Sequence, residues 1–405
     1  MIRLSRRLEA IAPSGTMAVT NEIFRLRADG VRILNFGAGE PDFETPERIG
    51  DAARRAIARG QTRYTPAAGL VELREAIVAK MARINQLEVS VEEVIATTGG
   101  KHALFLGLQA LLNPGDEVLI PVPYWTSYGD MVRLAGGNPV FLPTSASDGF
   151  KVGPEQLAAA INPRTRAFVL NTPSNPTGAV YSESELSSLG EVLAAAPEVA
   201  LLTDEVYELL DFSGQPSRHL LELCPKLRAR CLIINSVSKS YAMTGWRVGY
   251  AVGPSVWIQA MTMLQGQSTT GTSSISQVAA AEALSGGPDE AVMLEEFRRR
   301  RDLVCERWQA LPDVSLVVPE GAFYVFPDVT RLLSASVDGE AIGTTTRLCQ
   351  LLLDREQIAL VPGEAFGAPG HVRMAYTAGV ATLEEGMEAI GRVFAELSSQ
   401  LTRID

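Results

Sequence analysis

The sequence predicts an α/β fold with a large, mostly parallel sheet covered by helices, followed by a smaller α+β part. The chain has 405 residues, which exceeds the usual size of a single hydrophobic core. From about residue 46 to residue 285, short apolar runs alternate with helical patterns. Beyond residue 289 the pattern changes to one long charged helix and several short apolar runs, which is typical of a second unit.

The first helix of the large part is expected at Thr45-Pro46-Glu47, because Thr suits the cap and Pro the first position of a helix. Gly60 is a natural stop for it. The run 94–97 predicts a strand, which Gly99-Gly100 separates from an apolar helix at 101–112. A turn at 113–116 then leads into a strand at 118–120.

Three further apolar runs, at 167–170, 199–202 and 231–234, predict the remaining strands of this part. Between the first two, Ser182 and Glu185 form the capping box of a helix. Strands that are apolar throughout and separated by helices indicate a mostly parallel sheet buried on both faces. Ligands of such sheets bind outside the carboxyl ends of the strands, so polar residues at those ends are candidates for a site.

The C-terminal part is expected to begin with a charged helix at 289–307, whose run from Arg298 to Arg301 is typical of a solvated face. Apolar runs follow at 315–318, 323–326 and 372–375, with an amphipathic helix near 340–355. This mixture of short runs and helices predicts a smaller α+β unit.

Composition excludes several classes of function. A net charge of −11 argues against nucleic acid or an anionic membrane as a partner. The four cysteines form no CxxC pair and indicate reduced structural thiols, and the three histidines are far apart, which disfavours a metal site. No apolar core of a signal peptide follows the N-terminal arginines, and no run approaches the ~18 residues of a membrane span. A soluble, cytoplasmic protein is therefore expected.

Lys239 is the first candidate functional residue, because it comes soon after the strand at 231–234 and beside small hydroxyl residues. Partial burial there would keep its amine neutral near pH 7, as a Schiff-base lysine requires. Ser236, Ser238 and Arg247 could bind a phosphate next to it. Other lysines lie among polar or turn residues and are expected to be solvated: Lys80, Lys151 and Lys226.

Further polar features follow other strands. Asp204 comes after the run 199–202, where a buried carboxylate could keep a cofactor ring nitrogen protonated or could simply cap a helix. Tyr207 and Asn175, the latter in the proline-rich turn 171–178, could donate to a ring oxygen, although such a turn can also merely break the chain. Thr98-Gly99-Gly100-Lys101 is a strand-to-helix turn whose free N–H groups could bind an anion.

In this order the motifs resemble the class I aminotransferases of pyridoxal-phosphate fold type I, and more closely their bacterial aspartate aminotransferase branch. The resemblance covers nearly the whole chain. It rests on the segments AGEPDF at 38–43, YTPAAG at 64–69, PYW at 123–125, the Asn175 turn, the segment 204–207, Lys239, Arg247 and Arg373. It implies a large domain at 46–288 with a seven-stranded sheet, and a small domain made of 1–45 and 289–405.

The resemblance also implies a role for each matching residue. Lys239 would hold pyridoxal 5′-phosphate covalently and shuttle protons, and Asp204 and Tyr207 would complete the catalytic set. The other implied cofactor contacts are Gly99, Gly100, Lys101, Trp125, Asn175, Ser236, Ser238, Arg247 and, from a neighbouring subunit, Tyr64. The implied substrate contacts are Gly39, Trp125, Asn175, Lys101, Arg373 and Thr16. Trp125 and Tyr64 could instead be a core aromatic and a turn residue. The segment 268–272 matches a loop that contacts the phosphate across the dimer.

The implied activity is ping-pong transfer of an amino group from an L-amino acid to a 2-oxo acid, by a homodimer with shared active sites. Lys101 matches a lysine that favours dicarboxylic substrates in this branch, so aspartate and 2-oxoglutarate are expected unless Lys101 is merely solvated. The segment 14–18, with Thr16, is similar to members that also use prephenate.

Two alternatives stay open. One is an aromatic or alanine aminotransferase or a C–S β-lyase on the same fold. The other is a cofactor-binding sensor without turnover, although the acidic chain lacks the basic arm that such a sensor needs to bind DNA.

Overall fold

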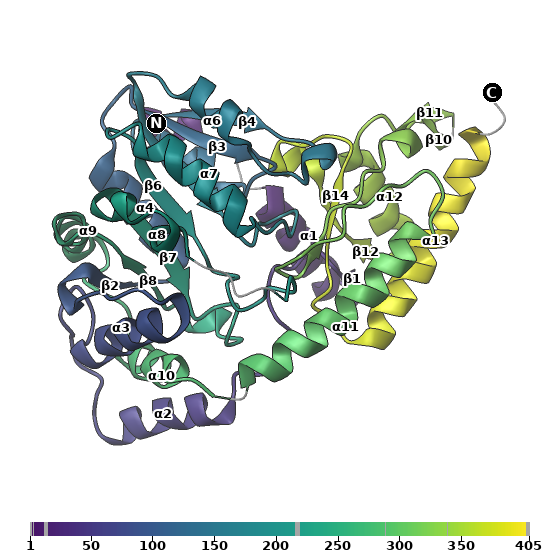
Figure 1. Cartoon of the computed structure of the whole chain (residues 1–405). Helices are drawn as coiled ribbons and strands as arrows, with labels where there is room; N and C mark the ends of the chain where they lie inside the picture. Colours follow the sequence, from purple (N-terminus) through teal and green to yellow (C-terminus); the bar gives the residue numbers. More distant parts are fainter. Residues whose placement is uncertain are drawn as a thin grey trace.

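The computed structural model describes residues 2, 4–11, 15–214, 219–287, 289–337 and 339–401 (Figure 1). A seven-stranded sheet has the order β2-β8-β7-β6-β5-β3-β4. Its strands are β2 (Val94–Thr97), β3 (Glu117–Val122), β4 (Asn138–Pro143), β5 (Thr165–Asn171), β6 (Ala200–Asp204), β7 (Cys231–Ser236) and β8 (Gly249–Val252). Only β8 runs antiparallel to its neighbours, which are β7 and β2. The predicted α/β class is therefore confirmed.

Two strands of this sheet, β4 and β8, are absent from the sequence-based expectation. β4 lies at the edge of the sheet, is partly exposed and contains Pro139 and Pro143, which suit an edge strand but weaken its sequence signal. β8 has only four residues and starts at Gly249. Neither strand therefore has the long apolar run that marks the central ones.

Alternate residues of the strands pack into two cores, one on each face of the sheet. In β3, for example, Leu119 belongs to one core, and Val118 and Ile120 belong to the other. The helices of this part are α2 (Glu47–Ala58), α3 (Val71–Asn85), α4 (Gly100–Leu111), α5 (Ser127–Leu134), α6 (Pro154–Ala160), α7 (Glu183–Ala194), α8 (Leu220–Leu223), α9 (Ser255–Ser268) and α10 (Ser274–Leu284). α4, α5 and α9 supply one core, while α2, α3, α7 and α10 supply the other.

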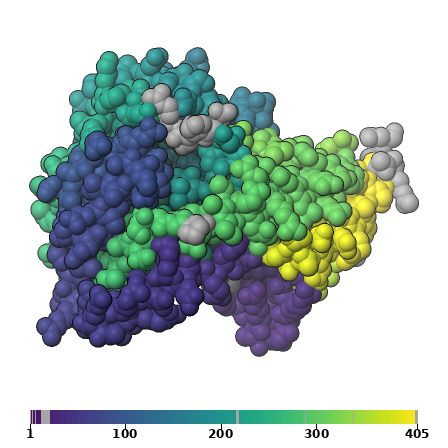
Figure 2. All heavy atoms as spheres, turned by 60° about the horizontal axis from the view of Figure 1, so that its bottom comes forward, coloured from purple at the N-terminus to yellow at the C-terminus, as the bar shows by residue number. Residues whose placement is uncertain are grey.

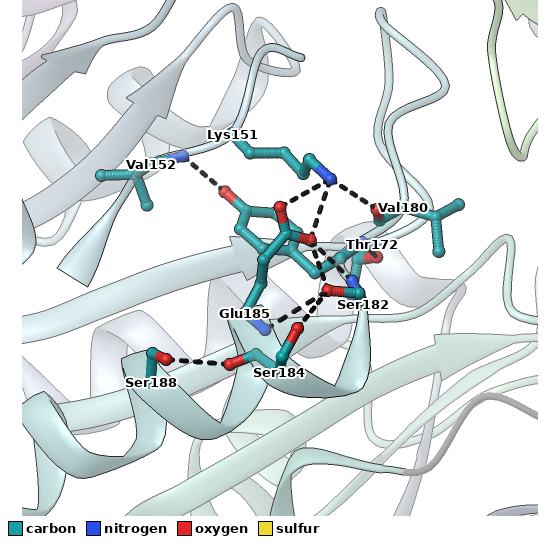
Figure 3. Close-up of polar contacts among 9 residues, drawn as sticks. Lys151, Val152, Thr172, Val180, Ser182, Ser184, Glu185 and Ser188 are labelled. Carbon is teal, nitrogen blue, oxygen red and sulfur yellow. Dashed lines mark hydrogen bonds and ion pairs between the residues drawn. The ribbon is translucent and has the colours of Figure 1, made fainter. Parts of the chain in front are cut away.

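The two predicted helix starts have different outcomes. Ser182 and Glu185 form the expected capping box of α7, with Ser182 N donating to Glu185 Oε2 at 2.7 Å (Figure 3). Thr45 does not cap α2, so that prediction is wrong. Its hydroxyl instead donates to the Ala242 carbonyl at 2.8 Å, because the chain before α2 passes close to the segment that follows Lys239.

The remaining strands form small sheets beside the large one. They are β1 (Leu34–Asn35), β9 (Tyr324–Val325), β10 (Ser336–Val337), β11 (Glu340–Ala341), β12 (Ile358–Ala359), β13 (Val361–Pro362) and β14 (Val372–Ala375). β1 pairs with β12 in parallel, and β14 lies between β13 and β9. The run 315–318 forms no strand of its own, since Ser315 makes only an isolated bridge to Asp328. The domain boundaries at 45/46 and 288/289 stay a prediction.

The helices of this second part are α1 (Gly15–Ala28), α11 (Asp289–Gln309), α12 (Thr345–Glu356) and α13 (Val380–Leu401). α11 and α13 lie side by side in Figure 1, and Figure 2 shows the segment that contains α11 running from the large-sheet part towards the C-terminal helix. Arg300 of α11 is buried, which corrects the expectation of a fully solvated arginine run. Ion pairs at 2.6 Å with Asp42 and 2.9 Å with Glu296 offset the burial of its charge.

Short 3-10 helices connect these elements: η1 (Arg6–Ala10), η2 (Val91–Glu93), η3 (Ala146–Asp148), η4 (Pro225–Arg230), η5 (Thr244–Trp246), η6 (Thr330–Ser334) and η7 (Gly363–Phe366). Of the helices within the described ranges, none combines the length and the apolar character that a membrane crossing requires.

Candidate active site

A pocket of about 280 Å³ lies at the carboxyl ends of the parallel strands. The sequence-predicted residues in its walls are Gly39, Gly100, Lys101, Trp125, Asn175, Asp204, Tyr207, Ser236, Ser238, Lys239, Arg247 and Arg373. Strand register explains part of this gathering, because Asn171 at the end of β5 pairs with Asp204 at the end of β6. The Asn171 side chain also donates to the Asp204 carbonyl at 2.9 Å.

The start of α4 forms one end of the pocket. Gly99 precedes the helix with φ at 84°, and no described side chain caps the helix. A Cβ on Gly99 would overlap the Arg247 guanidinium, and one on Gly100 would lie 3.3 Å from Val206 Cγ1. The backbone conformation therefore requires glycine at position 99, and a Cβ there would also displace the guanidinium. The positive end of the helix dipole and its free N–H groups favour an anion here.

Arg247 and two serines surround the same end of the pocket. Arg247 has left-handed φ at 57°, and its Nη1 donates to the Thr244 carbonyl at 2.9 Å. Ser236 ends β7, and its hydroxyl accepts the N–H of Ser238 at 3.2 Å. A guanidinium and two hydroxyls beside a helix N-terminus make a suitable site for a phosphate group.

Asp204 provides a buried carboxylate in the same pocket, with a side chain that is nearly inaccessible to solvent. Tyr128 Oη donates to its Oδ2 at 2.6 Å. Burial raises the pKa of Asp204 to about 6, and the Tyr128 hydrogen bond opposes that rise. The carboxylate is thus ionised at neutral pH and would favour a cationic ring nitrogen beside it.

Lys239 carries the amine of the pocket. Its Nζ donates to the Gly39 carbonyl and lies 6.0 Å from the Phe323 ring. Burial lowers the pKa of Lys239 to about 8, while the Glu40 carboxylate opposes this shift. A lysine with a depressed pKa exists partly as the neutral amine near pH 7, which is the form that acts as a nucleophile or base.

Arg373 lies on β14 and reaches the pocket from the smaller sheets. It is 3% exposed, with Nη1 donating to Asn175 Oδ1 at 3.0 Å and Nη2 to the Gly37 carbonyl at 2.7 Å. The Tyr324 ring lies 4.5 Å from its guanidinium, and its Nε has no hydrogen-bond partner among the described residues. No described carboxylate forms an ion pair with this buried cation, so the guanidinium is suited to an anionic ligand group.

Two tyrosines of the pocket, Tyr128 and Tyr324, escaped the sequence reasoning. Tyr324 Oη forms a 2.8 Å hydrogen bond with Tyr207 Oη, and the two rings meet edge to face. Tyr324 is part of a short apolar run, so its hydroxyl was not recognised as functional. Tyr128 could have been found from its place one helical turn after Trp125, whose ring it contacts edge to face at 5.4 Å.

Lys101 and Trp125 lie together in the pocket wall. Lys101 Nζ is 4.9 Å from the centre of the Trp125 ring, a distance at which the cation and the ring attract each other. Partial burial and the nearby Arg247 guanidinium both lower the pKa of Lys101. Lys101 therefore places a cation at the pocket rather than only in bulk solvent.

Two predicted residues, Gly99 and Tyr64, do not line the pocket. Gly99 lies directly behind its α4 end, as described above. Tyr64 is 94% exposed and lines a separate hollow with the segment 269–274. Thr16 belongs to α1, but its side chain lies outside the described part of the structure.

Known proteins that are similar to this chain in sequence are aminotransferases. A family model described as aminotransferase class I and II matches residues 31–390. The chain is 43% identical to an aspartate/prephenate aminotransferase of Nitrosomonas europaea over 97% of its length and 100% of that protein. It is 44% identical to an aspartate aminotransferase of Geobacillus stearothermophilus, covering 96% and 98% of the two chains.

Solved structures agree with these sequence relatives. The aspartate aminotransferase of Rhizobium meliloti superimposes with a TM-score of 0.94 at 42% identity, covering 98% of this chain and 99% of the other. The aspartate aminotransferase of Thermus thermophilus with maleate gives a TM-score of 0.90 at 43% identity, covering 97% and 100%.

Proposed function

The chain belongs to the aminotransferase class I and II family, and from this premise we propose that it binds pyridoxal 5′-phosphate and transfers the amino group of aspartate to 2-oxoglutarate. The family and the named relatives make it an aminotransferase that acts on amino acids and 2-oxo acids. The observation that supports the cofactor is the combination of a buried carboxylate, a lysine of depressed pKa and a glycine-lined anion site in one pocket.

The residues of the pocket fit this cofactor at both of its ends. The start of α4, with Ser236, Ser238 and Arg247, would hold the phosphate, and a Cβ at Gly99 would displace the Arg247 guanidinium from this end of the pocket. Asp204 would face the ring nitrogen, Asn175 and Tyr207 the ring oxygen, and Trp125 the ring face. Lys239 would form the covalent link.

When bound, pyridoxal phosphate supplies an electron sink for the bonds at the substrate α-carbon. Lys239 Nζ would remove the α-proton and return it during the reaction, a role for which a pKa of about 8 keeps part of the amine neutral. Asp204 in its ionised form would keep the ring nitrogen positively charged.

Arg373 would orient the substrate through its α-carboxylate. Its two terminal nitrogens are held by Asn175 and Gly37, and its guanidinium lies over Tyr324, so it is arranged before the substrate arrives. An amino acid and a 2-oxo acid share this carboxylate, which is why one site can serve both halves of a ping-pong reaction. Gly39 would complete the carboxylate site through its backbone.

Lys101 supports the proposed dicarboxylic substrate, because it places a second cation in the pocket, near Trp125. The names of the two sequence relatives agree with this choice, and one of them includes prephenate. Prephenate is therefore proposed as a second acceptor, with Thr16 near it.

The experiment that tests the substrate is Lys101→Ala. We expect the KM for aspartate to rise about tenfold or more, the value of one lost charged hydrogen bond, while the KM for an aromatic amino acid changes little. Lys226→Ala removes an exposed lysine outside the pocket and is the matched control. Equal changes for both substrates would contradict the distal-carboxylate role.

We further propose a homodimer with shared active sites, in which Tyr64 and the loop 268–272 contact the partner's phosphate. The almost complete exposure of Tyr64 beside this loop supports the proposal. We expect Lys239→Ala to be inactive and Tyr64→Ala to be impaired. When the two proteins are mixed and reassembled, about a quarter of the wild-type activity should return above the level of Tyr64→Ala, because half of the random dimers have one intact site. Activity that stays absent in confirmed mixed dimers would argue against shared sites.

The same proposal includes a cytoplasmic location and a two-domain division. The cysteines within the described part are free thiols, as expected in a reducing compartment. The pairing of β1 with β12 supports a small domain to which both ends of the chain contribute.

A further inference from the structure

A buried polar cluster lies behind the pocket, and none of its three central residues, Lys80, Glu208 and Asn235, is in the pocket walls. Its centre is Lys80 of α3, which is 1% exposed and therefore not solvated, contrary to the expectation from the sequence. Lys80 Nζ forms an ion pair with Glu208 and donates to Asn85 Oδ1 at 2.8 Å. The local sequence is misleading because several neighbouring polar residues of α3 face solvent, whereas Lys80 lies on the side of the helix that packs against the sheet. Its Nζ is 5.9 Å from the centre of the Tyr250 ring.

Glu208 uses both carboxylate oxygens within the cluster. Oε1 accepts from Lys80 and, at 2.7 Å, from Asn235 Nδ2, while Oε2 accepts from Asn85 Nδ2 at 3.0 Å. Glu208 is partly buried and these donors compensate its charge, whereas removal of Glu208 alone would leave the buried Lys80 charge unpaired. These three contacts hold the side chain of Glu208 in place.

Asn235 transmits this position to the phosphate end of the pocket. It is buried on β7, and its Oδ1 accepts the N–H of Ser236 at 2.7 Å. Its carbonyl lies so close to α4 that a Cβ on Gly100 would be 3.5 Å away. The side chain of Asn235 thus holds the end of β7, and its backbone lies against the start of α4.

Glu208 also belongs to the segment that carries Asp204 and Tyr207, since its N–H donates to the Glu205 carbonyl at 3.0 Å in the turn after β6. The carboxylate of Glu208 therefore cross-links two segments that approach opposite ends of the proposed cofactor. One carries the carboxylate for the ring nitrogen, and the other carries Ser236 and Ser238.

We propose that the Lys80–Glu208 pair, acting through Asn235, positions the phosphate cradle relative to Asp204 and so sets the affinity for the phosphate of the cofactor. Lys80, Glu208 and Asn235 are positioning residues, because none of them reaches a ligand directly. The inference rests on the proposed function, since it assumes that Ser236 and the start of α4 hold that phosphate.

The test compares pyridoxal phosphate with pyridoxal, which lacks the phosphate, as ligands of the cofactor-free full chain. The double variant Lys80→Met with Glu208→Leu removes both charges together and takes away the acceptor of Asn235. We expect its dissociation constant for pyridoxal phosphate, measured by quenching of tryptophan fluorescence, to rise about tenfold, the value of one charged hydrogen bond. The constant for pyridoxal should stay near that of the wild type.

Lys151 and Glu185 provide a matched control. They form another lysine–carboxylate pair in the same part of the molecule, with contacts to Val180 and Ser182 (Figure 3). Among the described residues, neither of them lines the pocket. Lys151→Met with Glu185→Gln should leave both dissociation constants unchanged, because Gln can still occupy the capping box.

Each outcome has a distinct meaning. Equal weakening of both ligands, or no weakening of either, would overturn the inference. If the double variant does not fold, Asn235→Ala tests the same link with the Lys80–Glu208 pair intact, and it should show the same selective loss. If the wild type itself fails to bind pyridoxal phosphate, the proposed function is wrong and the inference, which rests on it, falls as well.

Discussion

Replacing Tyr128 by Phe removes one hydrogen bond from Asp204 and leaves an aromatic ring in the same place. The bond is 2.6 Å long, buried, and opposes the effect of burial on the carboxylate. A hydrogen bond to a charged group contributes about 1.5–3 kcal/mol, which corresponds to about one to two pKa units. The pKa of Asp204 should therefore rise by this amount above its wild-type value of about 6.

The assay is the affinity of the cofactor-free chain for pyridoxal phosphate between pH 5 and pH 9. Ionised Asp204 attracts the ring nitrogen, so affinity is present above its pKa and is lost as pH falls through that value. The wild type should lose affinity near pH 6, and the Tyr128→Phe variant at a pH about one to two units higher.

Tyr181→Phe is the matched control for this variant. Tyr181 is also a buried tyrosine, but its hydroxyl accepts a hydrogen bond from Val152 N at 2.8 Å and does not touch Asp204. Its pH profile should match that of the wild type. An unchanged midpoint in Tyr128→Phe, with the fold intact, would refute the role given to this hydrogen bond.

Three further substitutions have defined outcomes. Lys239→Met should abolish turnover. Burial lowers the pKa of Lys239 from 10.5 in the unfolded chain to about 8 in the folded one, so the stability that the wild type has above pH 10.5 is lost as pH falls through 8. The cofactor-free variant should therefore be up to about 3 kcal/mol more stable than the wild type to urea at pH 7, but not at pH 11. A variant with wild-type stability at pH 7 would contradict this. Arg373→Lys should raise the KM of both amino and oxo acids about a hundredfold in steady-state kinetics and leave cofactor affinity unchanged, since a lysine cannot form a bidentate contact with the substrate α-carboxylate. Unaltered KM values would exclude the proposed role of Arg373 in binding this carboxylate. Gly249→Ala would push a Cβ into the backbone at Gly99 and Gly100, so thermal unfolding should show a loss of about 1–3 kcal/mol, and a wild-type melting temperature would show that α4 can move away.

Local patterns in the sequence were sufficient for the central strands and for the polar residues that follow them. β3, β5, β6 and β7 are continuous apolar runs because both faces of the sheet are covered, and such runs can be recognised without any knowledge of their neighbours. Asp204 and Lys239 stand out for the same reason, because each is a charged residue at or soon after the end of such a run. The family resemblance then assigned roles that single residues could not indicate.

Contacts between distant segments were decided only by the tertiary structure. Tyr128 meets Asp204 across 76 positions of sequence, and Arg373 meets Asn175 across 198. Lys80 appears solvated in its helix but is buried, because its partner Glu208 lies on another segment. The cost of burying a charge depends on which groups folding brings to it, and hydrophobic periodicity carries no information about those groups. The sequence therefore determined the central strands of the sheet and the residues at their ends, whereas the tertiary structure decided which residues support them.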